Sequence, residues 1–339
     1  MKKGIYFLLA AVGLHAASMD KVHLNGYTSV EYEKRVDGES GGDEHGSFDA
    51  DLFDLVINLQ ATPNLRVTTD ITWEHGAASE DGRGNVAMEY GFPEYTVYPW
   101  LKFRAGKMFT HFGIYNEIHT AKPTTLTVKE PLSTNKNDKL GSDVRFYPRW
   151  STGVAVLGDI PLEEYEGEYI VQVSNGEQEE TNPFEEDNNS YKAVNGTMYF
   201  TFEEEIRIGG SAYWDRMSPD LEVVSIGAQA EWLSEFLTLE VEGVAGYVGM
   251  SDKTYRYGLT TLIGYTFAEM YTPYIRGELY DPNEDEEDDI SVLYVYGINT
   301  MIDEGFYLKT ELNTLVSQDN ALTDDKYFTE FKSALVLGF

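Results

Sequence analysis

The sequence predicts an all-β fold: a transmembrane, antiparallel, up-and-down β-barrel of about 16 strands with a long third external loop. Three observations carry this prediction. Polar and apolar residues alternate with a period of two from residue 22 onward, the connections between the alternating segments are short and long in turn, and the last segment alternates up to Phe339. No stretch after residue 17 has the roughly 20 apolar residues of a spanning helix.

The composition excludes several classes of function. The chain has 339 residues, no cysteine and a formal net charge of −33. Without cysteine there are no disulfides, thiolate metal sites or cysteine nucleophiles. The acidic charge argues against nucleic acid as a partner, because phosphate binding needs a basic surface. Aromatic residues make up 14 % of the chain, and the many tyrosines favour half-buried β surface and membrane interface.

The first 17 residues have the layout of a secretory signal peptide. Met1-Lys2-Lys3 is positively charged, residues 4–14 are apolar, and the small residues Ala16 and Ala17 follow. The alternative is a buried N-terminal helix, but the flanks and the terminal position favour an export signal. We therefore expect residues 1–17 to be a signal peptide and residues 18–339 to form a single barrel domain.

About 16 alternating segments follow the signal peptide. In residues 65–73 the even positions, from Arg66 to Thr72, are polar and lie opposite a mostly apolar face. Residues 255–267 and 306–316 repeat the pattern, so one face suits lipid and the other suits water. The predicted strands begin near residues 22, 48, 65, 86, 101, 143, 164, 191, 206, 221, 236, 255, 271, 290, 306 and 327.

The connections alternate in length, which a barrel inserted from one side of a membrane explains. The short connections are residues 62–64, 98–100, 159–161, 203–205, 233–235, 268–270 and 303–305. Most connections on the other side are longer and acidic: residues 36–47, 78–85, 113–142, 175–190, 281–289 and 318–326. Two connections on that side, residues 217–220 and 250–254, are short exceptions. An even number of strands places both termini on the side of the short turns.

Aromatic residues lie near the ends of the segments, as in the girdles of membrane barrels. They are Tyr98, Trp100, Trp150, Trp232, Phe236, Phe267, Tyr271, Tyr274 and Phe306. The alternative for any one of them is packing in a soluble β core.

The final segment, residues 327–339, carries Tyr327, Phe331, Leu335 and Phe339 on one face and ends on that aromatic residue. It resembles the terminal strand of bacterial outer-membrane barrels, and the mature chain resembles the bacterial porins in architecture. The resemblance implies a location in the outer membrane, contact with its lipid and lipopolysaccharide, and homotrimers. It also implies that the barrel-assembly machinery recognises Phe339. Residues 103–107 (FRAGK) and 112–117 (FGIYNE) are similar to segments of phosphate-selective porin O/P-like proteins.

The porin resemblance implies that the third external loop, residues 113–142, folds into the lumen and narrows it. The surrounding region, residues 102–149, has nine basic and four acidic side chains in an otherwise acidic chain. A basic ring at a constriction favours anions. This predicts a constriction that prefers anions such as phosphate, with Lys102 and Arg104 pointing inward from a strand. The candidate pore-lining residues are Arg66, Lys102, Arg104, Lys107, Lys122, Lys129 and Arg145.

The alternative is that these bases neutralise acidic side chains of the lumen and select nothing. The candidate partners are Asp70, Glu74, Glu166, Glu168 and Glu240. The acidic outer connections also oppose anion preference, because a negative vestibule enriches cations.

The acidic runs themselves, residues 284–289 and 177–187, are expected to be solvated surface, with weak Ca²⁺ or Mg²⁺ binding as the alternative. Residues 281–292 lack the glycine and the final glutamate of an EF-hand loop. We predict no resident metal and no cofactor.

Catalytic motifs are absent from the sequence, including His-Glu-x-x-His, Gly-x-Ser-x-Gly and a phosphate loop. The favoured function is a porin, not an enzyme, that lets small hydrophilic solutes and ions diffuse passively. The alternatives are a non-conducting structural or partner-binding barrel, whose lumen would be blocked or occupied, and an outer-membrane enzyme.

Overall fold

The computed structural model describes residues 19–39, 45–74, 86–118, 121–133, 146–162, 165–176, 189–321 and 326–339. In these ranges sixteen strands form one closed barrel, and the chain also makes two short 3-10 turns. The elements are η1 (Met19–Lys21), β1 (Val22–Gly38), β2 (Ser47–Thr62), β3 (Leu65–Glu74), β4 (Val86–Tyr98), β5 (Leu101–Phe109), η2 (Lys122–Thr124), β6 (Trp150–Ile160), β7 (Glu166–Ser174), β8 (Ala193–Phe202), β9 (Ile206–Arg216), β10 (Glu222–Leu233), β11 (Leu237–Val248), β12 (Thr254–Tyr265), β13 (Tyr271–Asp281), β14 (Ser291–Asp303), β15 (Phe306–Ser317) and β16 (Tyr327–Gly338). Across these ranges no helix has the length and apolarity that a membrane crossing requires.

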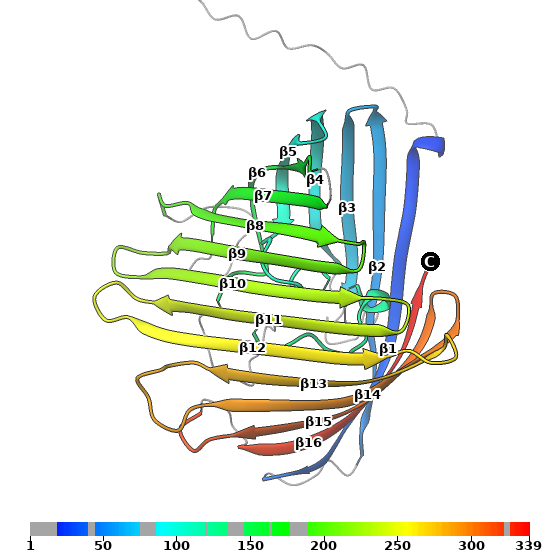
Figure 1. The fold of residues 1–339 in the computed structure, drawn as a ribbon, viewed down its shortest axis with the longest axis vertical. Coiled ribbons are helices and arrows are strands. Elements are labelled where there is room, and N and C mark those ends of the chain that lie inside the picture. Colours follow the sequence, from blue (N-terminus) through cyan, green and yellow to red (C-terminus); the bar gives the residue numbers. More distant parts are fainter. Residues whose placement is uncertain are drawn as a thin grey trace, which may run out of the picture.

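Each strand pairs antiparallel with its neighbours in the chain, so the strands follow the wall in sequence order (Figure 1). β1 and β16 close the barrel, with Tyr27 opposite Gly338 at one end and Gly38 opposite Phe328 at the other. Closure leaves no unpaired sheet edge, which is the condition for a sheet to lie in lipid. The predicted antiparallel up-and-down barrel is confirmed.

Fifteen of the predicted strand starts lie within two residues of the observed ones, and the exception is β6. The predicted start near residue 143 is wrong, because β6 begins at Trp150. Phe146 and Tyr147 are buried instead, and the Ser225 hydroxyl of β10 donates to the Phe146 carbonyl oxygen at 2.6 Å. Pro148 has no N–H to offer a strand ladder, so the alternating pattern before it does not extend β6.

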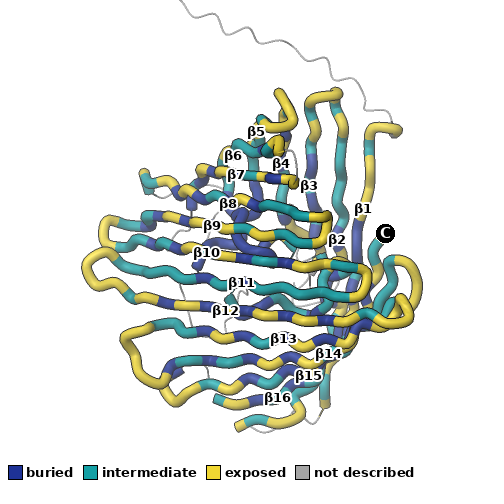
Figure 2. The backbone as a smooth tube through the Cα atoms, in the orientation of Figure 1, coloured by how far each residue is buried: buried dark blue, intermediate teal, exposed yellow. Residues whose placement is uncertain are grey.

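The two faces of the wall follow the predicted alternation (Figure 2). In β12 buried and exposed residues alternate along the whole strand, with Leu259 and Ile263 exposed and Thr260 buried. In β15 Lys309 and Glu311 are buried on the inner side, while Leu312 is exposed on the outer side. The apolar outer face can therefore meet lipid, and the inner face carries charged and polar groups.

The C-terminal residue completes the closing ladder. The Phe339 N–H donates to the Gly26 carbonyl oxygen, and the Gly26 N–H donates to the Phe339 carbonyl oxygen, both at 2.9 Å. A side chain at position 26 has no room, because a Cβ there would lie 2.4 Å from the Asp54 carbonyl oxygen and 2.6 Å from the Phe339 ring. Recognition of Phe339 by the assembly machinery stays a prediction.

Several of the aromatic residues expected near strand ends are exposed, among them Tyr98 and Trp100, whose rings stack at 5.3 Å. Tyr274 is an exception, and its assignment to an outer girdle is wrong. It is 3 % exposed, and its hydroxyl donates to Glu311 at 2.7 Å. Its position in β13 has the inward parity of Arg276 and Glu278, so the ring belongs to the lumen.

Candidate functional site: the lumen and the β5–β6 connection

The β5–β6 connection (residues 110–149) is the third one on the side opposite the termini, and the structure describes its residues 110–118, 121–133 and 146–149. These three segments lie against the inner wall. η2 contacts β16 and β1, the strands at the closure of the barrel, although the connection starts at β5 and ends at β6. The described segments therefore cross the lumen.

The first segment, residues 110–118, packs on the inner side of β8 to β11. The Gly113 N–H donates to the Ser211 hydroxyl at 3.1 Å, and the Thr197 hydroxyl donates to the His111 carbonyl oxygen at 2.6 Å. The Tyr115 hydroxyl donates to Glu240 at 2.7 Å. Gly113 has φ +66°, a left-handed conformation that glycine adopts without strain, and this residue turns the chain toward the wall.

Charged side chains of the wall hold the backbone of the second segment, residues 121–133. The Val128 N–H donates to Glu311 at 2.7 Å, and the Leu132 N–H donates to Glu278 at 2.5 Å. Arg276 donates to the Lys129 carbonyl oxygen at 2.7 Å. Carboxylates thus accept from amide groups and cations donate to carbonyls, which satisfies a buried backbone that forms no ladder of its own.

Lys309 of β15 is the most enclosed of these cations. It is 0 % exposed, and its ammonium donates to the carbonyl oxygens of Lys122, Thr125 and Thr127. An ammonium has three protons and no acceptor, so three carbonyl oxygens use its donors fully. Lys309 therefore fixes the path of the connection around η2.

Lys122 and Lys129 of the connection form ion pairs with the first two strands. The Lys122 ammonium binds Glu31 and Asp51, and the Lys129 ammonium lies 2.8 Å from Glu31 and 3.5 Å from Asp51. Burial alone would lower the pKa of Lys129, but attraction by Glu31 and Asp51 outweighs it and raises the pKa above its ordinary value. Both predicted pore-lining lysines thus neutralise wall carboxylates.

Apolar side chains fill the space between the connection and the wall of β8 to β16. The Phe112 and Tyr147 rings stack at 4.2 Å, and Phe146 meets the edge of Tyr280 at 6.0 Å. The buried cluster comprises Phe112, Leu132, Phe146, Tyr147, Ala193, Tyr213, Met217, Val223, Val244, Leu262, Tyr274, Tyr280, Leu293, Val295, Leu315 and Phe328. The polar inner face predicted for the strands is thus interrupted by an apolar patch that the connection covers.

Arg66 and Arg104 share one carboxylate on the other side of the lumen. Arg66 lies 2.9 Å from one oxygen of Glu94, and Arg104 lies 2.8 Å from the other. Lys102 lies 3.0 Å from Asp159 of β6. The structure therefore brings Arg66 and Arg104 together near the short-turn ends of β3 and β5 and places Lys122 and Lys129 at a separate pair of acids.

Two more candidate residues complete the predicted set. Lys107 is buried, its ammonium donates to the Met88 carbonyl oxygen, and it lies 4.8 Å from the centre of the Trp150 ring. Arg145 lies outside the described residues. Sequence reasoning placed Lys309 and Glu311 on the inward face but missed that they, with Arg276 and Glu278, hold the connection. Their inward parity was the available signal.

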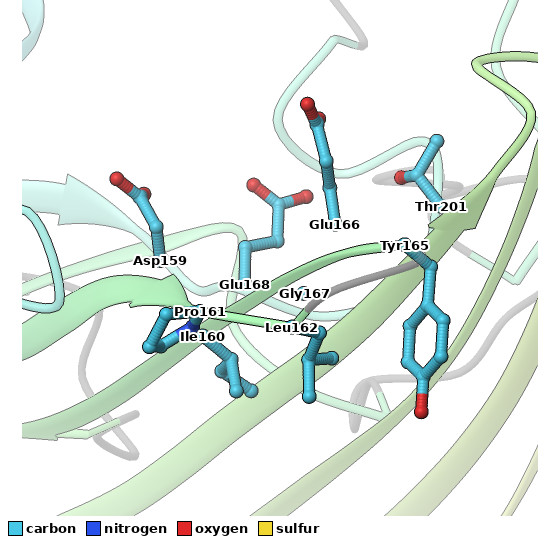
Figure 3. A pocket seen from close by; sticks show the side chains of 9 residues that line it. All are labelled: Asp159, Ile160, Pro161, Leu162, Tyr165, Glu166, Gly167, Glu168 and Thr201. Atoms are coloured by element: carbon cyan, nitrogen blue, oxygen red, sulfur yellow. The ribbon is translucent and has the colours of Figure 1, made fainter.

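Two pockets lined by described residues lie on the side of β5 to β9. The first, the rim pocket, has about 480 Å³ and lies at the short connection between β6 and β7. In Figure 3 Asp159, Glu166 and Glu168 point to the same side of this hairpin, and Ile160, Leu162 and Tyr165 point to the other. The second, the lumen pocket, has about 180 Å³ and lies beside the first segment of the connection. Glu168 lines both, so the pockets are neighbours.

Glu117 at the lumen pocket gives a pH prediction. Partial desolvation inside the barrel raises its pKa, but attraction by His111, Arg104 and Arg207 outweighs this and holds the pKa below its ordinary value. Such a group stabilises the fold fully above the ordinary carboxyl pKa of about 4.3, and that contribution is lost as pH falls through the lowered pKa. We expect the melting temperature to fall more steeply below about pH 4 in the wild type than in Glu117→Gln. Parallel melting curves between pH 7 and about pH 2 would contradict this assignment.

No metal-binding group of three or more His, Asp or Glu side chains occurs among the residues that the structure describes. In the acidic connection after β13, residues 284–288 are exposed, and Glu284 accepts a hydrogen bond from the Tyr257 hydroxyl at 2.8 Å. The other acidic run, residues 177–187, lies outside the described ranges.

Comparison with solved structures identifies the architecture. OmpF of Salmonella typhi is similar at a TM-score of 0.67 with 10 % identity, over 95 % of this chain and 99 % of that one. An anion-selective porin of Comamonas acidovorans is similar at 0.66 with 8 % identity, over 94 % and 99 % of the two chains. This is the porin fold. A trimer form of OmpT from Vibrio cholerae also has it, at a TM-score of 0.59 with 10 % identity over 94 % and 99 %.

Sequence comparison adds less than the porin fold does. No protein-family model matches the chain. An uncharacterized protein of Aquifex aeolicus (strain VF5) is 28 % identical over 187 residues, and the match covers 53 % of this chain and 39 % of that protein. This chain thus spans well under half of that relative. The general porin architecture predicted from the sequence is confirmed, and the narrower likeness to phosphate-selective porin O/P-like proteins stays a prediction.

Proposed function

We propose that this chain is an outer-membrane porin through which small hydrophilic solutes and ions diffuse passively. The single observation that carries the proposal is the closed sixteen-strand barrel of the described residues, with charged groups on its inner wall. Barrels of about sixteen strands leave an aqueous channel, whereas side chains fill those of about eight.

The proposal includes the partners expected from the sequence. The apolar outer face would contact outer-membrane lipid and lipopolysaccharide, residues 1–17 would direct export, and the barrel-assembly machinery would read Phe339. One structural neighbour is described as a trimer form, and we propose a homotrimer for this chain as well.

The ion pairs bear on selectivity. Anion preference needs bases that are not neutralised at the narrowest level. Lys122 and Lys129 are paired with Glu31 and Asp51, and Lys102 is paired with Asp159. These pairs support the alternative in which the bases neutralise lumen acids. The acidic residues 284–288 of the connection after β13 are exposed, and such negative charge at the outer mouth enriches cations. We therefore propose a weak cation preference, with the anion preference as the competing outcome.

A planar bilayer experiment tests both parts. The refolded mature chain, residues 18–339, should give stable conductance steps. Under a KCl gradient, the sign of its reversal potential should show that cations permeate better than anions. The double variant Arg66→Glu with Arg104→Glu should strengthen that preference. Anion preference in the wild type would overturn the sign and point to Arg66 and Arg104 as dominant. Absence of conductance from a folded barrel would overturn the porin and favour a structural or partner-binding barrel.

A further inference from the structure

The lumen pocket combines both signs of charge in a small space. Its charged lining consists of Arg104, Arg207, Glu117 and Glu168, and His111 lies between Arg104 and Glu117. These groups come from β5, β7, β9 and the first segment of the β5–β6 connection, so the pocket exists only in the closed barrel. Its volume of about 180 Å³ is below the range of about 300 Å³ and more that drug-sized ligands occupy. It suits a small solute.

The two guanidinium groups are held with their planes fixed. Arg207 stacks on the Tyr199 ring, 3.5 Å from its centre, and Arg104 lies 4.2 Å from the centre of the Phe92 ring. Stacking uses the flat face of a guanidinium and leaves its N–H edge for carboxylates. An arginine held in this way is suited to bind the carboxylate of a solute with two parallel hydrogen bonds.

Arg207 has a carboxylate neighbour that the lumen can reach, whereas Arg104 is held by buried Glu94 and by His111. Arg207 binds Glu168 and lies 3.3 Å from Glu231. The side chains of Arg207, Glu168 and Glu117 are 35 %, 53 % and 46 % exposed, respectively. Ion pairs of exposed groups are worth little, so a solute can exchange with them at small cost.

The charges select the class of solute. A monovalent anion would be attracted by the guanidinium groups but repelled by the carboxylates. A monovalent cation would be attracted by the carboxylates but repelled by the guanidinium groups. A molecule with an ammonium and a carboxylate a few bonds apart satisfies both. Leu157 and Ile170 provide an apolar side to the same space. We propose that the lumen pocket is a binding subsite for small zwitterionic solutes, of which α-amino acids are the common class. The inference rests on the proposed porin function and deepens it.

Uptake into proteoliposomes tests the subsite. The probes are labelled L-serine and labelled glycerol, which is similar in size and uncharged. Serine uptake by the wild type should saturate with concentration, while glycerol uptake should rise linearly. Arg207→Gln and Glu168→Gln should each raise the half-saturating serine concentration about tenfold or more, because each removes a charged hydrogen-bond partner. Glycerol uptake should stay unchanged in both variants.

The control variants lie at the outer end of the same wall. Arg216 of β9 and Glu222 of β10 are directly opposite each other, and Arg216→Gln and Glu222→Gln make the same charge changes away from the pocket. They should leave serine saturation intact. The exchanged pair, Arg207→Glu with Glu168→Arg, keeps both charges in the pocket and should restore saturation, which separates binding from misfolding of the single variants.

The outcomes separate the subsite from the porin. Linear serine uptake by the wild type with normal glycerol uptake would overturn the subsite and leave the porin. Saturation that survives in Arg207→Gln and Glu168→Gln would also overturn it. No glycerol uptake by a folded barrel would overturn the proposed porin function itself.

Discussion

Replacing Glu31 by Gln and Asp51 by Asn should detach the η2 region of the β5–β6 connection from the first two strands. These two carboxylates are 2 % and 7 % exposed, and both loop lysines, Lys122 and Lys129, bind them. Removing one side of a buried ion pair leaves an uncompensated charge and typically costs about 3–5 kcal/mol. We expect Lys122, which is 6 % exposed, to leave the wall for water and carry the backbone with it.

Two measurements check this prediction. The melting temperature of the refolded barrel should fall, and the single-channel conductance should rise because the lumen is wider. The quadruple variant that also carries Lys122→Met and Lys129→Met removes both signs together and should recover most of the lost stability, since whole buried ion pairs can be replaced by apolar groups at little cost. Equal stability of the double variant and the wild type would show that the ion pairs do not hold the connection.

Lys309→Met should have a comparable effect on the region of η2. The methionine keeps most of the apolar stem but supplies no proton to the carbonyl oxygens of Lys122, Thr125 and Thr127. A buried polar group left without a partner costs about 1–3 kcal/mol, and three carbonyls lose the same donor. Glu311 also loses the neighbouring positive charge. We expect a lower melting temperature and noisier channel current.

The matched control for Lys309→Met is Lys253→Met. Lys253 is in the outer connection after β11, with its ammonium 3.7 Å from the centre of the Tyr247 ring. The Lys253→Met variant makes the same chemical change at the solvent-exposed rim, so its melting temperature should match that of the wild type. If Lys309→Met melts like this control, water replaces the lysine at the three carbonyls and the buried ammonium is dispensable.

The strands and their faces were predictable because each depends on nearby residues. Period-two alternation determines which side of a strand is buried, and it predicts the inward positions of Thr260, Lys309 and Glu311 without reference to strand pairing. Turn residues determine where a strand ends, so most strand starts were predicted within two residues. The start of β6 was predicted too early because Phe146 and Tyr147 alternate like strand residues but pack against β10 and β13.

The sequence by itself determined the barrel, its inner and outer faces and the place of the basic connection between β5 and β6. Tertiary structure alone decided which charges meet. The Lys122 ammonium binds Asp51, which is 71 positions away in the sequence. The Lys122 carbonyl oxygen accepts from Lys309, which is 187 positions away. Contacts at such separations depend on how the sixteen strands close into a barrel and on which part of the wall the loop reaches. Neither produces a periodic pattern in the sequence. The charge of the basic region, taken from the sequence alone, predicts that it attracts anions. In the barrel, Lys122 and Lys129 of this region instead pair with carboxylates of the wall.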